Sequence, residues 1–361
     1  MLNDSLARAE AGSTTPTSDR PAKHDRLVRI LDRHGAESIA LTRPETLSWY
    51  FDGARTGVPY GGLPVFSALV HRDGTAQVTA LENEEERLGA EEIGGAEIRA
   101  VPWYADLVEH VPGALLDTAV TGELRQARAA LLPVERERYR MLGQDAAAAM
   151  THVLQRCRPD MSEYDLAADL AHAVLSTGAE PSVILVAGAA RGGIQHPLPT
   201  SAAVGDRVMA VLTARRFGLH VSLTRWARFG GAETTAEIAL REVEADAFAA
   251  TRPGREVREV LGDIASAYVR HGFGTADRPA WRQHHQGGPT GYLGRDPKAD
   301  PSTTTLVAAG GAFAWNPWVP HAKTEDTVLI DAEGVDVLSV DPAWPTVQVR
   351  GLPRPIALDL S

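Results

Sequence analysis

The order of helix and strand patterns after residue 133 constrains the fold of this chain most. Amphipathic helices are predicted at 133–154 and 162–175, and apolar strand patterns follow at 183–187, 208–213 and 219–229. The remaining patterns predict helices at 237–250 and 257–268 and short strands at 305–309, 311–315, 326–331, 335–340 and 346–350. Helices mixed with antiparallel strands indicate an α+β domain rather than a doubly wound parallel sheet.

A smaller α/β domain is predicted before it, over residues 24–132. Its patterns indicate a helix that ends at Gly35, a strand at 38–42, a hairpin of strands 65–70 and 76–81 around the turn Arg72-Asp73-Gly74, and a helix at 82–89. Residues 1–23 combine Ser, Thr and Pro with alternating charge, which predicts a disordered tail. The predicted divisions are therefore 1–23, 24–132 and 133–361.

The composition excludes several classes of function. The 361 residues carry a formal net charge of −11, which disfavours nucleic acid or an anionic membrane as the main partner because both repel an acidic surface. No run of about eighteen apolar residues occurs, and the first residues lack the apolar stretch of a signal peptide. Cys157 is the only cysteine, so an intrachain disulfide and a thiolate metal cluster are excluded. These features predict a cytoplasmic globular protein.

The segment from His284 to Asp296 is the strongest candidate for an active-site loop. It contains two adjacent imidazoles, several glycines, a proline and a guanidinium–carboxylate pair. This mixture favours neither a helix nor a strand, and loops of this kind often carry binding and catalytic residues. The alternative interpretation is an exposed polar turn.

Four motifs in the second domain form a recognisable pattern: an opening helix at Leu132–Tyr139, a helix start at Pro159–Leu166, a histidine in Ile194–Pro197, and an acidic ending at Lys323–Thr327. Together with the order of elements, they resemble the creatinase, aminopeptidase P and methionine aminopeptidase superfamily over residues 24–345. The resemblance implies a pita-bread C-terminal domain preceded by a smaller α/β domain.

The resemblance also implies that the metal site of this superfamily is lost. Metal-dependent members hold two divalent ions with two Asp, one His and two Glu, a ligand set suited to activating water. Here Val211 and Ser222 stand at the two Asp places, Gly288 at the His place and Asn316 at the first Glu place, so only Glu325 is retained. Because Val and Gly offer no donor, we expect no bound metal and no cofactor. A displaced ligand from the His284–His285 pair is the alternative.

Creatinase is the metal-free precedent within this superfamily, and the Tyr292–Asp296 ending of the candidate loop resembles its counterpart. The resemblance implies that His196 is the general acid–base, a task suited to a histidine because its pKa lies near neutral pH. The glutamates that clamp the guanidinium of creatine are replaced by Thr224 and Asn316, so creatine itself is not the expected substrate.

Each candidate residue also has a structural interpretation. His196, His285 and Glu325 form the expected catalytic set, where Glu325 orients His196 or holds a substrate nitrogen; the alternatives are a structural histidine and a remnant ion pair of Glu325 with Lys323 or an arginine. We expect one of His284 and His285 to face the pocket. Arg225 and Arg295 are the expected holders of a substrate carboxylate, because a planar guanidinium binds it at two points, and internal salt bridges are the alternative.

The remaining candidates line the predicted substrate pocket. Ser222 and Asn316 are expected to face it, and Trp315 and Trp318, which flank Asn316, either wall the pocket or belong to the core. Arg55 resembles the position that reaches the pocket of the neighbouring subunit in creatinase dimers, which predicts a homodimer.

Three functions remain open at this stage. The first is a metal-independent hydrolase that cleaves a C–N bond in a small amidine, amide or dipeptide-like metabolite. The second is a peptidase-like protein that binds a ligand without turnover. The third is a non-hydrolytic, lyase-type enzyme that uses the same acid–base groups. The retained His196, Glu325 and two arginines favour an enzyme acting on a small molecule.

Overall fold

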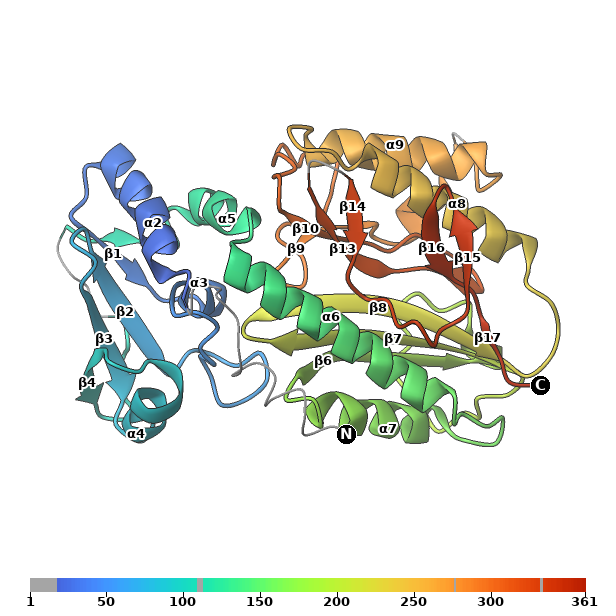
Figure 1. Cartoon of the computed structure of the whole chain (residues 1–361), viewed down its shortest axis with the longest axis horizontal. Helices are drawn as coiled ribbons and strands as arrows, with labels where there is room; N and C mark the ends of the chain where they lie inside the picture. Colours follow the sequence, from blue (N-terminus) through green and yellow to red (C-terminus); the bar gives the residue numbers. More distant parts are fainter. Residues whose placement is uncertain (1–17, 109–112, 276, 332–333) are drawn as a thin grey trace. The chain divides into compact units, whose positions relative to one another are not determined.

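The computed structural model describes residues 18–361 except 109–112, 276 and 332–333 (Figure 1). Its contacts divide the chain into two compact units: one runs to Arg136 and includes Arg216–Leu219, and the other contains Glu137–Arg215 and His220–Ser361. Most of the predicted tail, residues 1–17, lies outside the described residues. Within the rest of it, helix α2 already begins at Arg20 and Lys23 is buried, so the disorder predicted for this part is wrong.

The N-terminal unit is built on a five-stranded sheet in the order β4-β3-β2-β1-β5. The strands β1, β2 and β3 pair antiparallel, and the predicted hairpin turns at Gly74, whose φ of 91° suits glycine. The strands are β1 (Ser38–Leu41), β2 (Phe66–His71), β3 (Ala76–Leu81), β4 (Glu97–Val101) and β5 (Leu115–Leu116). The helices are α2 (Arg20–His34), α3 (Pro44–Tyr50), α4 (Glu85–Arg87), η1 (Leu88–Glu92) and α5 (Thr121–Ala129).

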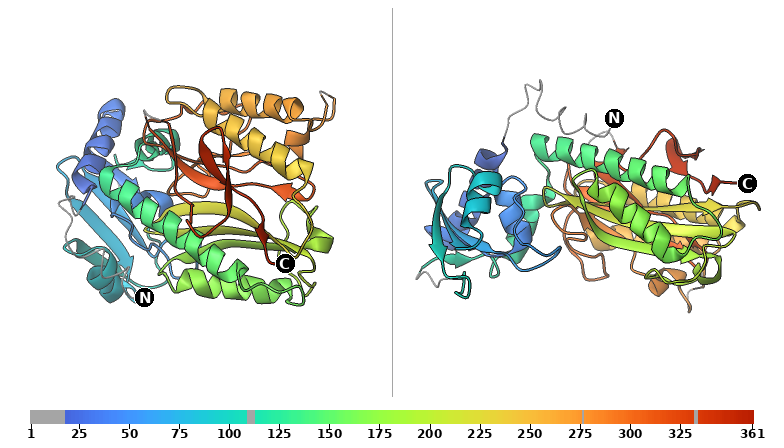
Figure 2. Two further views of the ribbon diagram at one scale, coloured as in Figure 1. Left: turned by 45° about the vertical axis from the view of Figure 1, so that its right-hand side comes forward. Right: turned by 90° about the horizontal axis from the view of Figure 1, so that it is seen from below.

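The C-terminal unit contains two larger sheets. The first has the order β17-β8-β7-β6, and α6 and α7 lie along one face of it (Figures 1 and 2). Helix α7 begins where Ser162 and Asp165 form a capping box, in which each side chain bonds the other residue's backbone N–H. The elements are α6 (Pro133–Leu154), α7 (Glu163–Leu175), β6 (Glu180–Gly188), η2 (Ala189–Arg191), β7 (Arg207–Arg216), β8 (Leu219–Arg228) and β17 (Leu358–Asp359).

The second sheet has the order β14-β13-β10-β9 and packs against the paired helices α8 and α9 (Figure 1). A capping box between Thr234 and Glu237 starts α8. The elements are α8 (Thr235–Ala250), α9 (Val257–Arg270), η3 (Ala280–Gln283), β9 (Gly287–Thr290), β10 (Ala312–Trp315), β13 (Asp326–Ile330) and β14 (Val335–Val337). Two short hairpins pair β11 (Trp318–Val319) with β12 (Ala322–Lys323) and β15 (Thr346–Val349) with β16 (Leu352–Pro355).

Two local predictions are wrong. The strand predicted at 305–309 is absent. The backbone of this segment bonds the start of α9, where Val257 N–H donates to Thr305 O at 2.9 Å, and it makes only an isolated bridge. Conversely, part of the predicted loop is strand β9, which pairs with β10. Glycine is required there because a Cβ on Gly287 would lie 2.0 Å from the carbonyl oxygen of Ala314.

None of the helices in the described part of the chain is long and apolar enough to cross a membrane.

Candidate active site

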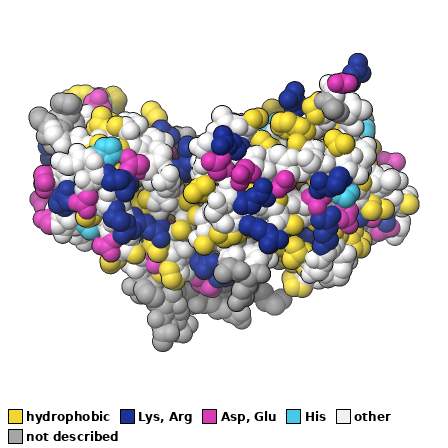
Figure 3. Space-filling view, turned by 90° about the horizontal axis from the view of Figure 1, so that it is seen from above, with side chains coloured by type: hydrophobic (Ala, Val, Ile, Leu, Met, Phe, Trp, Pro, Cys, Tyr) yellow, Lys and Arg dark blue, Asp and Glu magenta, His cyan; other side chains and the backbone are white. Residues whose placement is uncertain are grey.

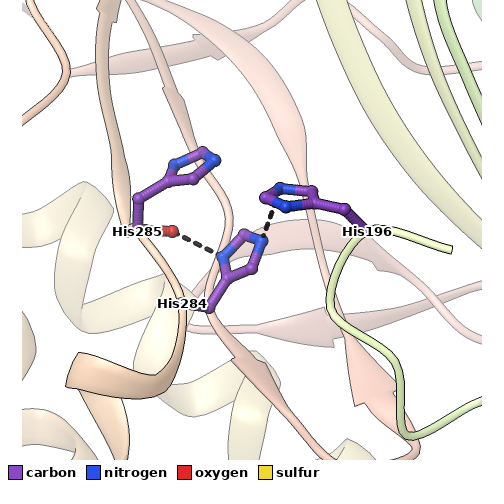
Figure 4. A group of neighbouring side chains, drawn as sticks. All are labelled: His196, His284 and His285. Carbon is purple, nitrogen blue, oxygen red and sulfur yellow. Dashed lines mark hydrogen bonds between the residues drawn. The ribbon is translucent and has the colours of Figure 1, made fainter.

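Three histidines from two distant segments meet in the C-terminal unit (Figure 4). His196 follows β6 and η2, whereas His284 and His285 directly precede β9. Nε2 of His284 lies 3.1 Å from Nε2 of His196, and the rings of His284 and His285 stack at a centroid distance of 4.5 Å. One nitrogen from each ring lies within 4.8 Å of the others. His284 is buried, His285 is half-buried and His196 is exposed, so His196 is the member of the cluster that solvent reaches most easily.

The loop that carries His196 is held at both ends by Glu163, the first residue of α7. The fully buried Glu163 carboxylate accepts hydrogen bonds from Gly188 N–H at 2.8 Å and from the N–H and hydroxyl of Thr200 at 2.9 and 2.7 Å. It also pairs with the guanidinium of Arg191. Because these donors flank the histidine on either side in the sequence, the carboxylate fixes where His196 stands.

Gln286 holds the other two histidines in place. Its buried side-chain NH₂ donates to the carbonyl oxygens of Trp281 and His284, both at 2.8 Å, and its side-chain oxygen accepts a bond from the Tyr268 hydroxyl at 2.9 Å. Trp318 stacks on the His284 ring at a centroid distance of 6.2 Å. The His284–His285 pair is therefore fixed by packing as well as by hydrogen bonds.

The contacts of His284 determine where the protons of the pair lie. Its Nδ1 is 2.6 Å from the carbonyl oxygen of His285, which can only accept, so Nδ1 carries the proton. In the neutral ring Nε2 then holds a lone pair and accepts a hydrogen bond from Nε2–H of His196. Nδ1 of His196 is left with the lone pair of that ring, and this atom is positioned to act as a base.

All three histidines favour the neutral form. Burial, followed by the positive charge of Lys323, lowers the pKa of His284 to about 3. Burial, followed by Arg295 and Lys298, lowers the pKa of His285 to about 3. The pKa of His196 is also lowered from 6.5, first by burial and then by Lys323. At neutral pH His196 is therefore a base rather than a cation.

Glu325 lies at the centre of a buried ionic group beside the histidines. Its Oε1 accepts from Nη2 of Arg295 at 2.5 Å, and its Oε2 lies 3.2 Å from the Thr224 hydroxyl and 3.4 Å from Nζ of Lys323. Burial alone would raise the pKa of Glu325, but Lys323 and Arg295 outweigh it, so the pKa is lowered and the carboxylate is ionised. Nη1 of Arg295 also lies 3.4 Å from the hydroxyl of Ser222.

The structure corrects two predicted pocket residues. Arg225 is buried, and its guanidinium donates to Asp326 at 2.8 Å and to the carbonyl oxygen of Ser339 at 2.6 Å, so it is an internal ion pair and not a holder of a substrate carboxylate. Trp315 is also fully buried; its Nε1–H donates to Thr251 at 2.8 Å and its ring stacks on Phe313 in the core. Arg225 is held by the charge of Asp326, and Trp315 is held by the apolar side chains of the core.

The other predicted residues divide between the site and the scaffold. Asn316 is buried next to the histidine loop, with its N–H donating to the carbonyl oxygen of Gln286 at 3.0 Å and its side-chain oxygen without a partner among the described residues. Trp318 belongs to the site, because its ring stacks on that of His284. Arg55 pairs with Glu91 and Glu92 inside the N-terminal unit, so its guanidinium already has counter-ions within its own chain.

Comparison with known proteins identifies the family. A model of metallopeptidase family M24 matches residues 137–333, more than half of the chain. The chain belongs to metallopeptidase family M24. This membership confirms the predicted superfamily and places the M24 chain among the peptidase-like hydrolases. No relative was found among curated proteins.

Solved structures confirm the predicted pita-bread architecture. This M24 chain is similar to an Xaa-Pro dipeptidase from Bacillus anthracis, with a TM-score of 0.71, 17% identity and coverage of 90% of this chain and 98% of that one. It is also similar to the prolidase from Pyrococcus horikoshii, with a TM-score of 0.71, 14% identity and coverage of 88% and 98%. A dipeptidase from Mycobacterium ulcerans gives a TM-score of 0.70, 18% identity and coverage of 91% and 98%. At such identities the likeness concerns the fold alone.

The side chains of this M24 chain do not fit a dinuclear metal site made from the predicted ligand places. Val211 packs in an apolar cluster, and Gly288 has no side chain and pairs with Ala314 in the sheet. The retained Glu325 is neutralised by Arg295 and Lys323, which supply the positive charge that a metal would bring. Another donor set is present, because His196, His284 and His285 together could hold a single ion through imidazole nitrogen.

Three residues that position the site were not predicted as functional. Glu163 and Gln286 occur in predicted motifs, but nothing in their local sequence shows what they contact. For Lys323, the ion pair with Glu325 was considered only as a structural alternative, and the structure shows this pair. For Lys323 one signal was available: the chain has only three lysines, at 23, 298 and 323, and one of them stands two residues before Glu325.

Proposed function

We propose that this M24 chain is a metal-independent hydrolase that cleaves a C–N bond in a small amidine, amide or dipeptide-like metabolite, with His196 as the general acid–base. The observation that carries the proposal is the 3.1 Å contact between Nε2 of His196 and Nε2 of His284. It leaves a neutral, solvent-reachable imidazole with its Nδ1 lone pair available, which is what a general base needs at neutral pH.

The reaction needs one proton to move twice. As a water oxygen attacks the carbon of the C–N bond, Nδ1 of His196 takes a proton from that water. The imidazolium then gives the proton to the leaving nitrogen as the C–N bond breaks. The products are the hydroxylated carbon fragment and an amine, and His196 returns to its neutral form. His284, held neutral by burial, fixes the ring of His196 without competing for the proton.

Arg295 is the proposed holder of a substrate carboxylate, and Glu325 positions it. Both oxygens of Glu325 are engaged by Arg295, Lys323 and Thr224, which supports a role in fixing these groups rather than in moving a proton. His285, Ser222, Asn316 and Trp318 complete the proposed substrate surroundings. A guanidinium suits the task because its planar fork matches the two oxygens of a carboxylate.

A homodimer is part of the proposal. Several large apolar side chains after Arg55 are exposed, with 64% of Val58, 59% of Tyr60 and 86% of Leu63 accessible. Apolar side chains grouped in one loop are typical of an interface, which supports association through the N-terminal unit.

We do not expect nucleic acid or a membrane as a partner. On the face shown in Figure 3, basic and acidic side chains lie side by side. Among the ion pairs of the C-terminal unit, Arg270 and Arg350 both pair with Asp246. Basic side chains that are neutralised within the chain do not form the positive surface that binds phosphate backbones.

The proposal is tested by following product formation in water enriched in ¹⁸O. Amidines, N-acyl amino acids and dipeptides, including Xaa-Pro dipeptides, are incubated with the protein and with His196→Ala, and new amines and labelled carbon fragments are detected by mass spectrometry. We expect ¹⁸O in the carbon fragment with the unchanged protein only. Cleavage without ¹⁸O would indicate a lyase, and tight binding of one compound without cleavage would indicate a binding protein.

A further inference from the structure

Two buried cations share one carboxylate beside the histidine cluster. The side chains of Arg295, Lys323 and Glu325 are 13%, 2% and 3% exposed, and both cations pair with Glu325, at 2.5 and 3.4 Å. No other ion pair of these two cations occurs within the described part of the chain. When Lys323 is protonated, the group therefore carries one more positive than negative charge in a place that water barely reaches. Burial lowers the pKa of Lys323, and the charge of Arg295 adds to this effect against the opposing charge of Glu325.

Buried cations elsewhere in the chain are balanced differently. Lys23, equally inaccessible, lies between Asp52 and Glu135 at 2.7 and 3.2 Å. Arg354 lies between Glu244 and Asp326, both at 2.6 Å. Because an unbalanced buried charge is costly, such an excess persists where a ligand supplies the missing charge.

The same two cations have unused hydrogen-bond donors. Nε of Arg295 is buried and has no partner among the described residues. The ammonium of Lys323 offers three donors, and its one ion pair, with Glu325, is as long as 3.4 Å. Because these donors belong to two cations that share one carboxylate, the fitting ligand is an acceptor with negative charge.

The cations also lie within the electrostatic reach of the acid–base group. Lys323 is the second cause, after burial, of the lowered pKa of His196 and of His284. Arg295 contacts Ser222 and Glu325, two of the five places where a metal-dependent relative is expected to hold its ions. A side-chain cation thus contacts two of the five predicted ligand places.

We propose that Arg295 and Lys323 together form a carboxylate site beside His196, and that the substrate carries one carboxylate close to the bond that is cleaved. That this carboxylate lies close to a bond that is cleaved rests on the proposed function. One carboxylate supplies the single missing charge. Nη1 and Nη2 of Arg295 already donate to Gly294, Ser222 and Glu325, so one carboxylate oxygen can accept from Nε–H of Arg295 and the other from the ammonium of Lys323. A neutral amide has one such oxygen and no charge to match the two cations. In this arrangement Lys323, together with Arg295, determines the specificity for a substrate that carries a carboxylate.

The three lysines of the chain make the site directly observable. Protein labelled with ¹³C at lysine Cε gives three side-chain signals in an NMR spectrum, which Lys298→Met and Lys323→Met assign. Sodium acetate is titrated against sodium chloride at equal ionic strength, followed by sodium phosphate. Binding is read without turnover, so the result does not depend on whether the protein is a hydrolase.

We expect acetate to shift the Lys323 signal saturably while the Lys23 and Lys298 signals stay in place, and Arg295→Gln to abolish the shift. Arg140→Gln, which removes an arginine paired with Asp336 instead, should leave the shift intact. Absence of a saturable shift in the unchanged protein would overturn the proposal, and so would an equal shift of all three signals. Binding of phosphate but not acetate would replace the carboxylate site with a phosphate site. If Lys323→Met fails to fold, Lys23→Met assigns the remaining signal.

Discussion

Nε2 of His196 lies 3.1 Å from Nε2 of His284, and Nδ1 of His284 lies 2.6 Å from the carbonyl oxygen of His285. A carbonyl accepts only, so these two contacts allow a single arrangement of protons in the neutral pair. The exposed ring, His196, donates through Nε2 and keeps a lone pair on Nδ1. This order supports the proposed roles of the two imidazoles, in which His196 exchanges the proton and His284 holds the His196 ring in orientation.

Replacing His196 with alanine should reduce kcat by about 10²–10⁴-fold while substrate binding changes little, because a positioned proton-transfer group contributes in this range. The measurement is steady-state kinetics on a substrate found with labelled water. His172→Ala, which removes an exposed histidine from α7, is the matched control. A His196→Ala variant with nearly full turnover would contradict the assignment.

The pH profile of kcat/KM should fall on its acid side only below pH 6.5. In the proposed mechanism the base form of His196 is the active one. Its pKa is lowered by burial and by Lys323, so we expect kcat/KM to rise with pH below 6.5 and to be level through neutral pH. Lys323→Met removes the second cause and should move this fall to higher pH. A fall that starts above 6.5 in the unchanged protein would argue against His196 as the base.

Chelators should leave the activity unchanged, and elemental analysis should find no stoichiometric divalent metal. The reason is that Val211 and Gly288 offer no donor and that Ser222 and Asn316 offer neutral oxygens in place of carboxylates, together with the neutralised Glu325. A transition metal near one per chain that is lost in His285→Ala would contradict metal independence and would assign it to the three histidines.

Glu163→Gln should lower stability and kcat together. Its carboxylate accepts three hydrogen bonds and the Arg191 ion pair, and a glutamine would turn an NH₂ group toward one set of donors. Leaving a buried donor unpaired costs about 1–3 kcal/mol, which urea denaturation measures. Glu180→Gln, which loses a more exposed pair with Arg215, is the control. Unchanged denaturation and kcat would show that Glu163 does not hold the His196 loop.

A dimer should be found by light scattering at micromolar concentration. The proposed contact surface includes exposed Tyr60 and Leu63, so Leu63→Asp should shift the equilibrium toward monomer because it places a charge in an apolar interface. Leu198→Asp, which changes an exposed leucine of the C-terminal unit, is the control; 70% of Leu198 is accessible, against 86% of Leu63. A monomer in the unchanged protein would contradict the proposal.

The sequence alone determined most of the helices and the long strands, the family, and which residues stand at the predicted ligand places. Helix α7 was predictable because its cap and its apolar spacing are local features, as are those of the β2–β3 hairpin. That the predicted ligand places do not form a dinuclear site was predictable because Val211 and Gly288 lack donor atoms in any conformation. His196 and Glu325 could be proposed from the motifs that contain them.

Only the tertiary structure decided which charges and rings meet. Arg225 and Arg295 looked alike in the sequence, yet Arg225 is bound by Asp326 and Arg295 by Glu325, 101 and 30 residues away. The contact between His196 and His284 spans 88 residues, and the pairing of Gly287 with Trp315 makes a strand from a segment with the composition of a loop. Such pairings depend on partners that are distant in the chain, and local propensity carries no information about them.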